Sequence, residues 1–256
     1  MDNLLFGLNN KNILITGGSG FLGKQFTDAF LNEKANVFII DIKKPKKNKS
    51  IKYFKADITK ENELIKILNY FKKNNIKIDA LINNAAINYI PKKTKKNNLQ
   101  LENFSNDLWD MDISLSLKGS YLCTKIFGTY MSEFKKGAIL NMSSDLGIIA
   151  PDQRIYKKFN FVKPVTYSVT KHGIIGLTKY TASYWGEKNI RCNAIAPGGM
   201  FNNQDKLFVK KINKLIPLGR MAKKNEYNAL VLFLCSDLSS YINGATISAD
   251  GGRTII

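Results

Sequence analysis

The chain has 256 residues, of which 44% are hydrophobic and 23% are charged, a length that can bury the core of one large α/β domain or two small ones. No apolar run reaches the roughly 20 residues of a membrane-spanning helix, which excludes an integral membrane protein. The first residues lack the pattern of a secretory signal, and the three cysteines show no metal-ligand spacing. We therefore expect a cytoplasmic protein with reduced thiols and no bound metal.

The net charge of +19 comes from 39 basic and 20 acidic residues. Only four of the basic residues are arginines, and the lysines are spread over every segment. A surface that follows a nucleic-acid backbone concentrates its charge and favours arginine, so this pattern does not predict nucleic-acid binding. Attraction of an anionic small molecule stays open.

Short apolar runs alternate with segments of helical periodicity along the chain. The predicted strands are 12–16, 36–41, 51–57, 78–86, 137–144, 189–197 and 245–250, and the predicted helices are 21–33, 61–73, 106–134, 166–186 and 226–235. Strands that alternate with helices of this length predict an α/β fold, with a parallel sheet covered by helices on both faces. No linker of biased composition divides the chain, so we expect one domain over residues 1–256.

A glycine-rich segment, Thr16–Gly23, lies between the first predicted strand and the first predicted helix. It contains a GxGxxG pattern, in which glycine permits a tight turn and a close approach to a pyrophosphate at the helix N-terminus. The pattern alone also fits an ordinary turn, but the order of strand, loop and helix favours dinucleotide binding.

The second predicted strand ends in Asp41, 18 residues beyond Gly23. A carboxylate there can accept hydrogen bonds from the adenosine ribose and repel a 2′-phosphate, which favours NAD over NADP. Lys43 and Lys44 follow closely and can pair with a phosphate, so NADP stays possible. A turn aspartate without a ligand is the structural alternative.

Tyr167 and Lys171 stand four residues apart on a predicted helix and so share one face of it. An ordinary tyrosine has a pKa of about 10, and a nearby ammonium group lowers it toward the range of general acid–base catalysis. Ser144, at the end of a predicted strand, can hydrogen-bond a substrate carbonyl. The Tyr–Lys spacing and the serine at a strand end each also occur by chance in unrelated sequences.

The only histidine, His172, has no carboxylate or cysteine nearby and is expected to be structural.

Taken in order, these motifs resemble the short-chain dehydrogenase/reductase family over essentially the whole chain. The matching elements are TGGSGFLG (16–23), Asp41, Asp57, NNAA (83–86), NMSS with Gly147 (141–147), YSVTK (167–171), RCNAIAPGG (191–199), IPLGRMA (216–222) and DGGRT (250–254).

The resemblance implies a Rossmann fold with a doubly wound, seven-stranded parallel sheet. It makes Tyr167 the catalytic acid/base, Lys171 the residue that binds the nicotinamide ribose and lowers the tyrosine pKa, and Ser144 the group that positions the reacting carbonyl or alcohol. It assigns cofactor contacts to Gly17, Ser19, Gly20, Phe21, Leu22, Gly23, Asp41, Ile42, Asp57, Ile58, Asn83, Asn84, Ala85, Ala86, Tyr167, Lys171, Pro197, Gly198 and Met200. Hydride passes between the nicotinamide and a substrate carbon.

Three features depart from the short-length branch of the family. Phe21 stands where that branch has glycine, and the loop spacing is that of the longer, sugar-nucleotide-modifying branch. Ser116 stands where the family has an asparagine that holds a water linked to the catalytic lysine, so Ser116 is expected to keep or to weaken this relay. Residues 150–164 lengthen the segment between Ser144 and Tyr167.

The inserted segment 150–164 is aromatic and basic and is expected near the substrate mouth. With residues 88–100 and a lid at 198–216, it predicts a cationic pocket. The insertion and the motifs after it resemble short-chain dehydrogenases of bacterial flagellin-modification and nonulosonic-acid gene clusters. Alternatively, the insertion contributes only to the surface through which copies of the chain assemble, and not to the substrate site.

We therefore expect an NAD(P)-dependent oxidoreductase that interconverts an alcohol and a ketone on a sugar or sugar phosphate. A 3-oxoacyl-thioester reductase fits the 216–222 and 250–254 motifs equally well, and a nucleotide-binding protein with little turnover is a third hypothesis. Family members assemble through their two long helices, so the resemblance also implies a homodimer or homotetramer through 106–134 and 166–186.

Overall fold

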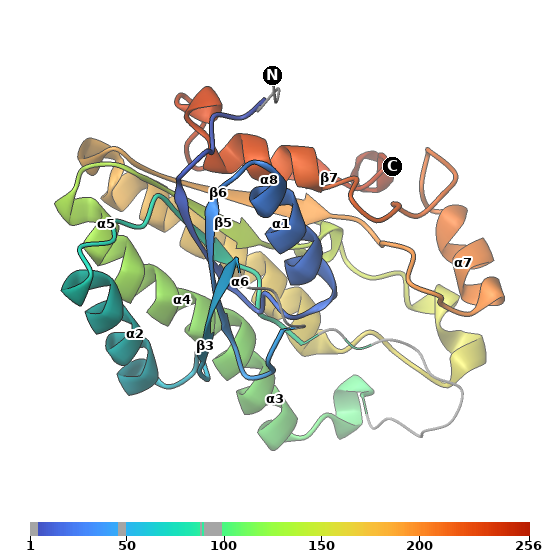
Figure 1. Cartoon of the computed structure of the whole chain (residues 1–256). Helices are drawn as coiled ribbons and strands as arrows, with labels where there is room; N and C mark the ends of the chain where they lie inside the picture. Colours follow the sequence, from blue (N-terminus) through green and yellow to red (C-terminus); the bar gives the residue numbers. More distant parts are fainter. Residues whose placement is uncertain (1–4, 46–49, 88, 90–98) are drawn as a thin grey trace.

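The computed structural model describes residues 5–45, 50–87, 89 and 99–256. Its centre is one parallel sheet of seven strands in the order β3-β2-β1-β4-β5-β6-β7 (Figure 1). The strands are β1 (Asn12–Thr16), β2 (Asn36–Asp41), β3 (Ile51–Lys55), β4 (Ala80–Asn83), β5 (Gly137–Met142), β6 (Ile190–Pro197) and β7 (Thr246–Ala249). The expected doubly wound, seven-stranded fold is confirmed, and the strand order reverses between β1 and β4. At such a reversal the connections leave in opposite directions, which opens a crevice at the carboxyl ends of the strands.

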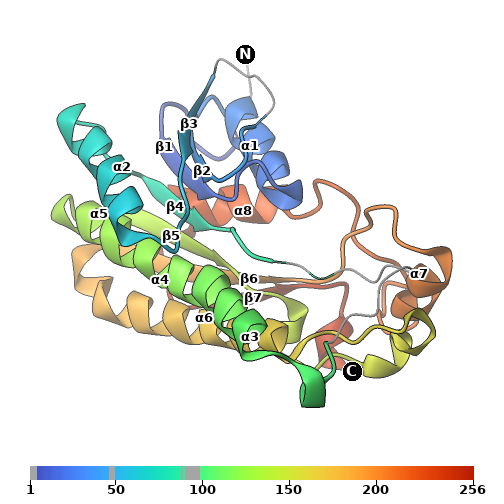
Figure 2. The ribbon, with the colours of Figure 1, turned by 90° about the horizontal axis from the view of Figure 1, so that it is seen from below.

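Helices cover both faces of the sheet (Figure 2). They are α1 (Phe21–Asn32), α2 (Glu61–Lys73), α3 (Asn106–Asp112), α4 (Gly119–Cys123), α5 (Thr129–Glu133), α6 (Val165–Tyr184), α7 (Lys206–Asn213) and α8 (Asn228–Cys235). Successive strand residues point to opposite faces. In β1, Leu14 therefore packs with Phe71 of α2, whereas Ile13 and Ile15 pack with Phe26 of α1.

The long helix predicted at 106–134 is a continuous helical stretch over residues 106–133. It consists of α3, α4 and α5 joined by two π-helical segments, Ile113–Lys118 and Thr124–Gly128. Its start is fixed by Ser105, whose hydroxyl accepts a hydrogen bond from the Leu108 N–H at 3.3 Å. The helix predicted from 226 begins two residues later, because the Glu226 carboxylate accepts bonds from Arg220 and from the Lys223 N–H in the preceding turn.

The inserted segment 150–164 folds as two 3-10 turns, Gln153–Ile155 and Lys157–Phe159, beside helix α7 of the expected lid (Figures 1 and 2). Their apolar side chains form a third hydrophobic cluster, separate from the two against the sheet. Its buried members are Leu99, Ile155, Tyr156, Phe159, Phe161, Phe208, Ile212, Ile216 and Met221. The insertion and the lid are therefore held together by a small core of their own.

Within the described part of the chain, no helix combines the length and apolar character needed to cross a membrane.

Candidate active site

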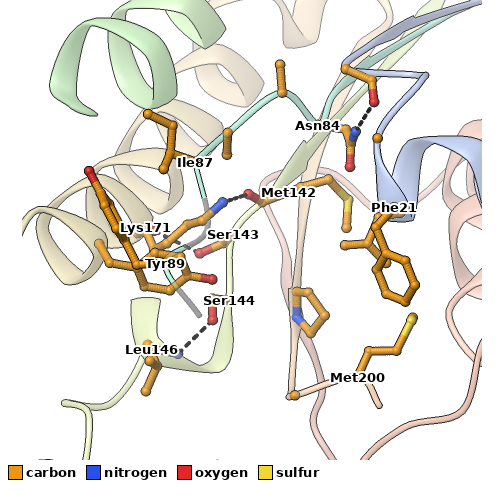
Figure 3. Close-up of a pocket in the computed structure, with 18 of the residues that line it drawn as sticks. Phe21, Asn84, Ile87, Tyr89, Met142, Ser143, Ser144, Leu146, Lys171 and Met200 are labelled. Carbon is orange, nitrogen blue, oxygen red and sulfur yellow. Dashed lines mark hydrogen bonds between the residues drawn. The ribbon is translucent and has the colours of Figure 1, made fainter. Parts of the chain in front are cut away.

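A cavity of about 490 Å³ lies at the carboxyl edge of the sheet, and Figure 3 shows part of its lining. One half is walled by the glycine loop and the ends of β2 and β3. The other half is walled by the end of β5, the inserted segment, the lid and the C-terminal residues. Most of the side chains assigned to the cofactor line it: Gly17, Gly20, Phe21, Leu22, Asp41, Ile42, Asp57, Ile58, Asn84, Ala85, Ala86, Tyr167, Lys171, Pro197, Gly198 and Met200.

The glycine loop is shaped by its own packing. Gly17 has φ +66° and donates its N–H to the Ile40 carbonyl at 2.8 Å. A Cβ on Gly23 would lie 2.1 Å from the Gly17 carbonyl oxygen, so only glycine lets α1 pack this closely on the loop. Gly23 therefore supports the loop from outside the cavity lining, and its assigned cofactor contact stays a prediction.

The N-terminus of α1 offers hydrogen-bond donors to the cavity. Gly20 is the N-cap residue, no side chain caps the helix, and the first turn carries no acidic residue. The backbone N–H groups of the first turn and the helix dipole therefore favour an anionic group at this point. Two residues of this turn, Phe21 and Leu22, line the cavity (Phe21 in Figure 3).

Asp41 ties the loop to the end of β2. Its carboxylate accepts hydrogen bonds from the N–H of Ser19 at 3.0 Å and from the N–H of Lys43 at 2.9 Å. The Ser19 hydroxyl donates to the Lys43 carbonyl at 2.7 Å. Ser19 thus lies behind Asp41 and does not line the cavity, whereas Asp41 does.

The two asparagines after β4 have different surroundings. Asn84 lines the cavity and donates to the carbonyls of Thr16 and Gly17, both at 3.1 Å (Figure 3). Asn83 is buried below the surface and donates to Thr124 and Asn141 at 2.9 and 2.8 Å. The side chain of Asn83 therefore links β4 to its neighbours, and its assigned cofactor contact stays a prediction.

Ser144, Tyr167 and Lys171 come together, as the spacing on α6 and the end of β5 predicted. All three line the cavity. Ser144 donates to the Asp145 carboxylate at 2.7 Å and accepts from the Leu146 N–H at 3.2 Å. Lys171 donates to the Met142 carbonyl at 2.7 Å (Figure 3).

Burial dominates the electrostatics of these groups. Burial raises the pKa of Tyr167 to about 12; the Ser144 hydrogen bond lowers this pKa and the nearby Asp145 raises it. Burial also lowers the pKa of Lys171 to about 8. The Lys171 Nζ lies 5.8 Å from the Tyr167 ring centroid. Loss of hydration therefore dominates the pKa of Tyr167, and the expected lowering by Lys171 is not among the causes of its shift.

Ser116 does not share the cavity lining with this group. It is buried in the first π-helical segment, its carbonyl accepts a hydrogen bond from Ser120 at 2.8 Å, and it does not line the cavity. A link from Ser116 to Lys171 stays a prediction.

His172 is exposed, with its Nδ1 2.9 Å from the Ser168 carbonyl. Among the residues that the structure describes, no three potential metal ligands cluster.

Three cavity residues were not singled out from the sequence. Lys163, from the inserted segment, places its Nζ 3.7 Å from the Tyr167 ring centroid. Asp145 and Arg253 form a buried ion pair of 2.6 Å. The basic character of 150–164 pointed to Lys163 only as one of several lysines. Nothing local in the sequence pairs two residues that are 108 positions apart.

A crevice at the strand reversal, an uncapped helix N-terminus and a buried Ser–Tyr–Lys group together define the class of nucleotide-dependent oxidoreductases. Comparison with known proteins agrees. A family model described as enoyl-(acyl carrier protein) reductase matches residues 20–254. The chain belongs to the short-chain dehydrogenase/reductase family.

Curated relatives and solved structures are similar over nearly full length. The NAD-dependent glycerol dehydrogenase of Listeria innocua is 32% identical over 98% of this chain and 96% of its own. The 3-oxoacyl-[acyl-carrier-protein] reductase FabG of Thermotoga maritima is 31% identical over 97% and 99%. A short-chain dehydrogenase from Leptospira borgpetersenii with bound NAD+ has a TM-score of 0.89 and 32% identity, covering 97% of this chain and 94% of that one.

Proposed function

We propose that this protein is an NAD-dependent oxidoreductase that interconverts a secondary alcohol and a ketone on a polyol, sugar or sugar phosphate. The observation that carries the proposal is that the Tyr167 phenol, the Ser144 hydroxyl and the Lys171 ammonium line one cavity, with Tyr167 and Lys171 one turn apart on α6. These are the groups that proton transfer to or from a substrate oxygen requires.

The cavity fits a dinucleotide. The free N–H groups at the start of α1 suit a pyrophosphate, and the Asp41 carboxylate at the end of β2 suits ribose hydroxyls. Asp57 and Ile58 line the wall beyond Asp41, where the adenine is expected. A bound nicotinamide supplies the hydride acceptor or donor. NAD is favoured by the Asp41 charge, and NADP remains the alternative through Lys43.

The chain's own residues then handle the proton. In alcohol oxidation Tyr167 accepts the proton of the substrate hydroxyl, and in ketone reduction it returns the proton to the oxygen. Because Ser144 donates its own hydrogen to Asp145, its oxygen is oriented to accept a hydrogen bond from the substrate hydroxyl. Lys171, anchored on the Met142 carbonyl, keeps a positive charge beside the phenol.

Several observations support a polyhydroxylated substrate. The similar proteins include a glycerol dehydrogenase and, at 27% identity, a D-threitol dehydrogenase of Mycolicibacterium smegmatis. The substrate half of the cavity carries charged and polar side chains, including Asp145, Lys163 and Gln204. From the resemblance of the inserted segment, we propose that the reaction belongs to bacterial surface-glycan or flagellin modification.

A 3-oxoacyl-thioester reductase is the second candidate. Similarity to the FabG enzymes of Thermotoga maritima and Chlamydia trachomatis, at 31% and 30% identity, favours it. An acyl chain needs an apolar groove, and the third hydrophobic cluster exposes Phe208, Ile212 and Met221 to the cavity. A member that binds nucleotide with little turnover, acting as a sensor, is the third candidate.

The test is steady-state reduction of NAD+ and NADP+ with a panel of polyols, sugars and sugar phosphates, and oxidation of NADH and NADPH with a 3-oxoacyl thioester. Turnover of a polyhydroxylated substrate is expected. Thioester reduction without polyol oxidation would favour the second candidate, and nucleotide binding without any turnover would favour the third.

We also propose a cytoplasmic homodimer or homotetramer. Large hydrophobic side chains are exposed on the two long helices: Trp109, Met111, Tyr121, Val169, Tyr180 and Tyr184. Burial of such a surface against a second copy is favourable. Light scattering is expected to give a multiple of the 28.9 kDa chain mass, and a monomer would refute the assembly.

A further inference from the structure

The substrate half of the cavity carries more positive than negative charge. The charged side chains that line it, among the described residues, are Asp145, Lys163, Lys171 and Arg253. Lys171 is held beside Tyr167 through the Met142 carbonyl. Two cations, Lys163 and Arg253, therefore face one carboxylate, Asp145, in this half of the cavity.

Arg253 is fixed on one side only. Its side chain is 5% exposed, and its Nη1 donates to the Asp145 carboxylate at 2.6 Å. No other N–H of this guanidinium has a hydrogen-bond partner within the described ranges. A guanidinium presents five donors in a rigid fork, so the edge not used by Asp145 can bind a second anion with two parallel hydrogen bonds.

Lys163 is brought to the cavity by a fixed loop. Its backbone N–H donates to the Gln153 side chain at 3.0 Å, and the same side chain donates to the Lys163 carbonyl at 2.9 Å. The ammonium group donates to the Tyr89 carbonyl at 3.2 Å and lies over the Tyr167 ring. This position is next to the phenol that faces the reacting oxygen.

The Lys163 ammonium group loses its hydration when the protein folds, before any anion binds. Burial lowers its pKa to about 7; Asp145 raises this pKa, and the charges of Lys171 and Arg253 lower it. An anion that enters the cavity would stabilise the ammonium form without further desolvation of the lysine. Such preorganised charge binds an anion more strongly than a hydrated surface lysine does.

We propose that Lys163 and Arg253 form an anion subsite, which binds a carboxylate or phosphate group of the substrate while the reactive hydroxyl meets Tyr167 and Ser144. The inference rests on the proposed function, because it places the anion relative to the hydroxyl that the site oxidises. It narrows the substrate to a sugar or polyol that carries a negative group.

The experiment is calorimetric titration of the NAD+-saturated protein with three probes: D-glucose 6-phosphate, D-gluconate and D-glucose. At least one anion is expected to bind about tenfold or more tightly than neutral glucose. An affinity difference of this size is what one charge-assisted hydrogen bond contributes. The phosphate and carboxylate arms show which anion the subsite prefers. Glucose affinity equal to that of both anions, or no binding of either anion, overturns the proposal.

Variants locate the effect. Lys163→Met is expected to weaken binding of the preferred anion about tenfold or more and to leave glucose affinity unchanged. Lys158→Met removes an exposed lysine of the same segment and is expected to change neither. Unchanged anion affinity in Lys163→Met refutes the role of Lys163. NAD+ affinity and melting temperature of the variant show whether its fold is intact.

The arginine is tested in the Asp145→Asn background, because Arg253→Met alone leaves the Asp145 charge buried without its partner. The double variant Asp145→Asn/Arg253→Met is compared with Asp145→Asn, and a further tenfold loss of anion affinity is expected. These readouts need no turnover. Anion binding without NAD+ reduction would support the subsite and reject the proposed function. Oxidation of neutral polyols without anion preference would support the proposed function and reject the subsite.

Discussion

The two halves of the cavity are built in different ways. The cofactor half is made by strand ends and the first helix, within a short stretch of sequence: Gly17, the α1 N-terminus and Asp41 are joined by backbone hydrogen bonds. The substrate half is assembled from the end of β5, the inserted segment, the lid and the C-terminal residues, which are far apart in sequence.

The substrate half also has its own small hydrophobic cluster, in which Tyr156 and Phe161 of the insertion contact each other and Tyr156 contacts Phe208 of α7. The shared sheet fixes the cofactor half, whereas this separate cluster fixes the substrate half. Changes on either side of this division therefore have separable effects, on nucleotide binding or on substrate binding.

The largest effect is expected where the halves meet. Tyr167→Phe removes the proton-transferring hydroxyl but keeps the ring under Lys163, so kcat is expected to fall about 10³–10⁴-fold. NAD+ affinity, which the other half determines, is expected to stay unchanged. Steady-state kinetics and NAD+ titration measure the two quantities. Tyr241→Phe, at a fully exposed tyrosine outside the two long helices, is the control and is expected to retain full activity; a variant at 167 that keeps its activity would contradict the assignment.

The next largest effect concerns the ion pair that joins β5 to the C-terminal residues. Asp145→Asn leaves the buried Arg253 charge without its partner, and the free energy of unfolding is expected to fall by about 3–5 kcal/mol. The double variant Asp145→Asn/Arg253→Met removes both charges and is expected to recover much of this loss. Urea denaturation of the three proteins measures the difference. Equal losses in the single and double variants would show that the pair is not the cause.

The sequence predicted the cofactor half well because its rules are local. Apolar runs placed every strand, and the i, i+4 spacing placed Tyr167 and Lys171 on one helix face. Lys163 also stands four residues from Tyr167, but it precedes α6, which begins at Val165. Helical periodicity therefore does not apply to it, and its direction is set by the bond to Gln153.

The side chains in the cofactor half that do not line the cavity also have a structural role. A position next to a motif can face inward or outward, and Asn83 and Ser19 are used to hold strands and loop together. The Asp145–Arg253 pair depends on the packing of segments 108 residues apart, which no local pattern encodes. The segment 88–100, expected to add to a cationic pocket, lies mostly outside the described residues; of it, Tyr89 lines the cavity.

A third effect concerns Lys163 in the substrate half and is seen in the pH dependence of the free energy of unfolding. Since burial lowers the pKa of Lys163 from 10.5 to about 7, the unfolded chain binds more protons than the folded one between these values. Stability from this group therefore rises with pH across that window. From pH 7 to 9.5, wild type is expected to gain about 2–3 kcal/mol more than Lys163→Met. Urea denaturation at both pH values measures this, and parallel stability curves would refute it.

The smallest effect is expected in the cofactor half and concerns the choice between nucleotides. Asp41→Asn removes the carboxylate charge at the end of β2 but keeps an oxygen that can accept a hydrogen bond from Ser19 or Lys43. Loss of repulsion toward a 2′-phosphate is expected to raise the NADP+ to NAD+ affinity ratio about tenfold. Asp57→Asn, in the same half of the cavity, serves as control and is expected to leave the ratio unchanged. Fluorescence titrations give both affinities. A ratio in Asp41→Asn equal to that of wild type would mean that Lys43, and not Asp41, determines the preference.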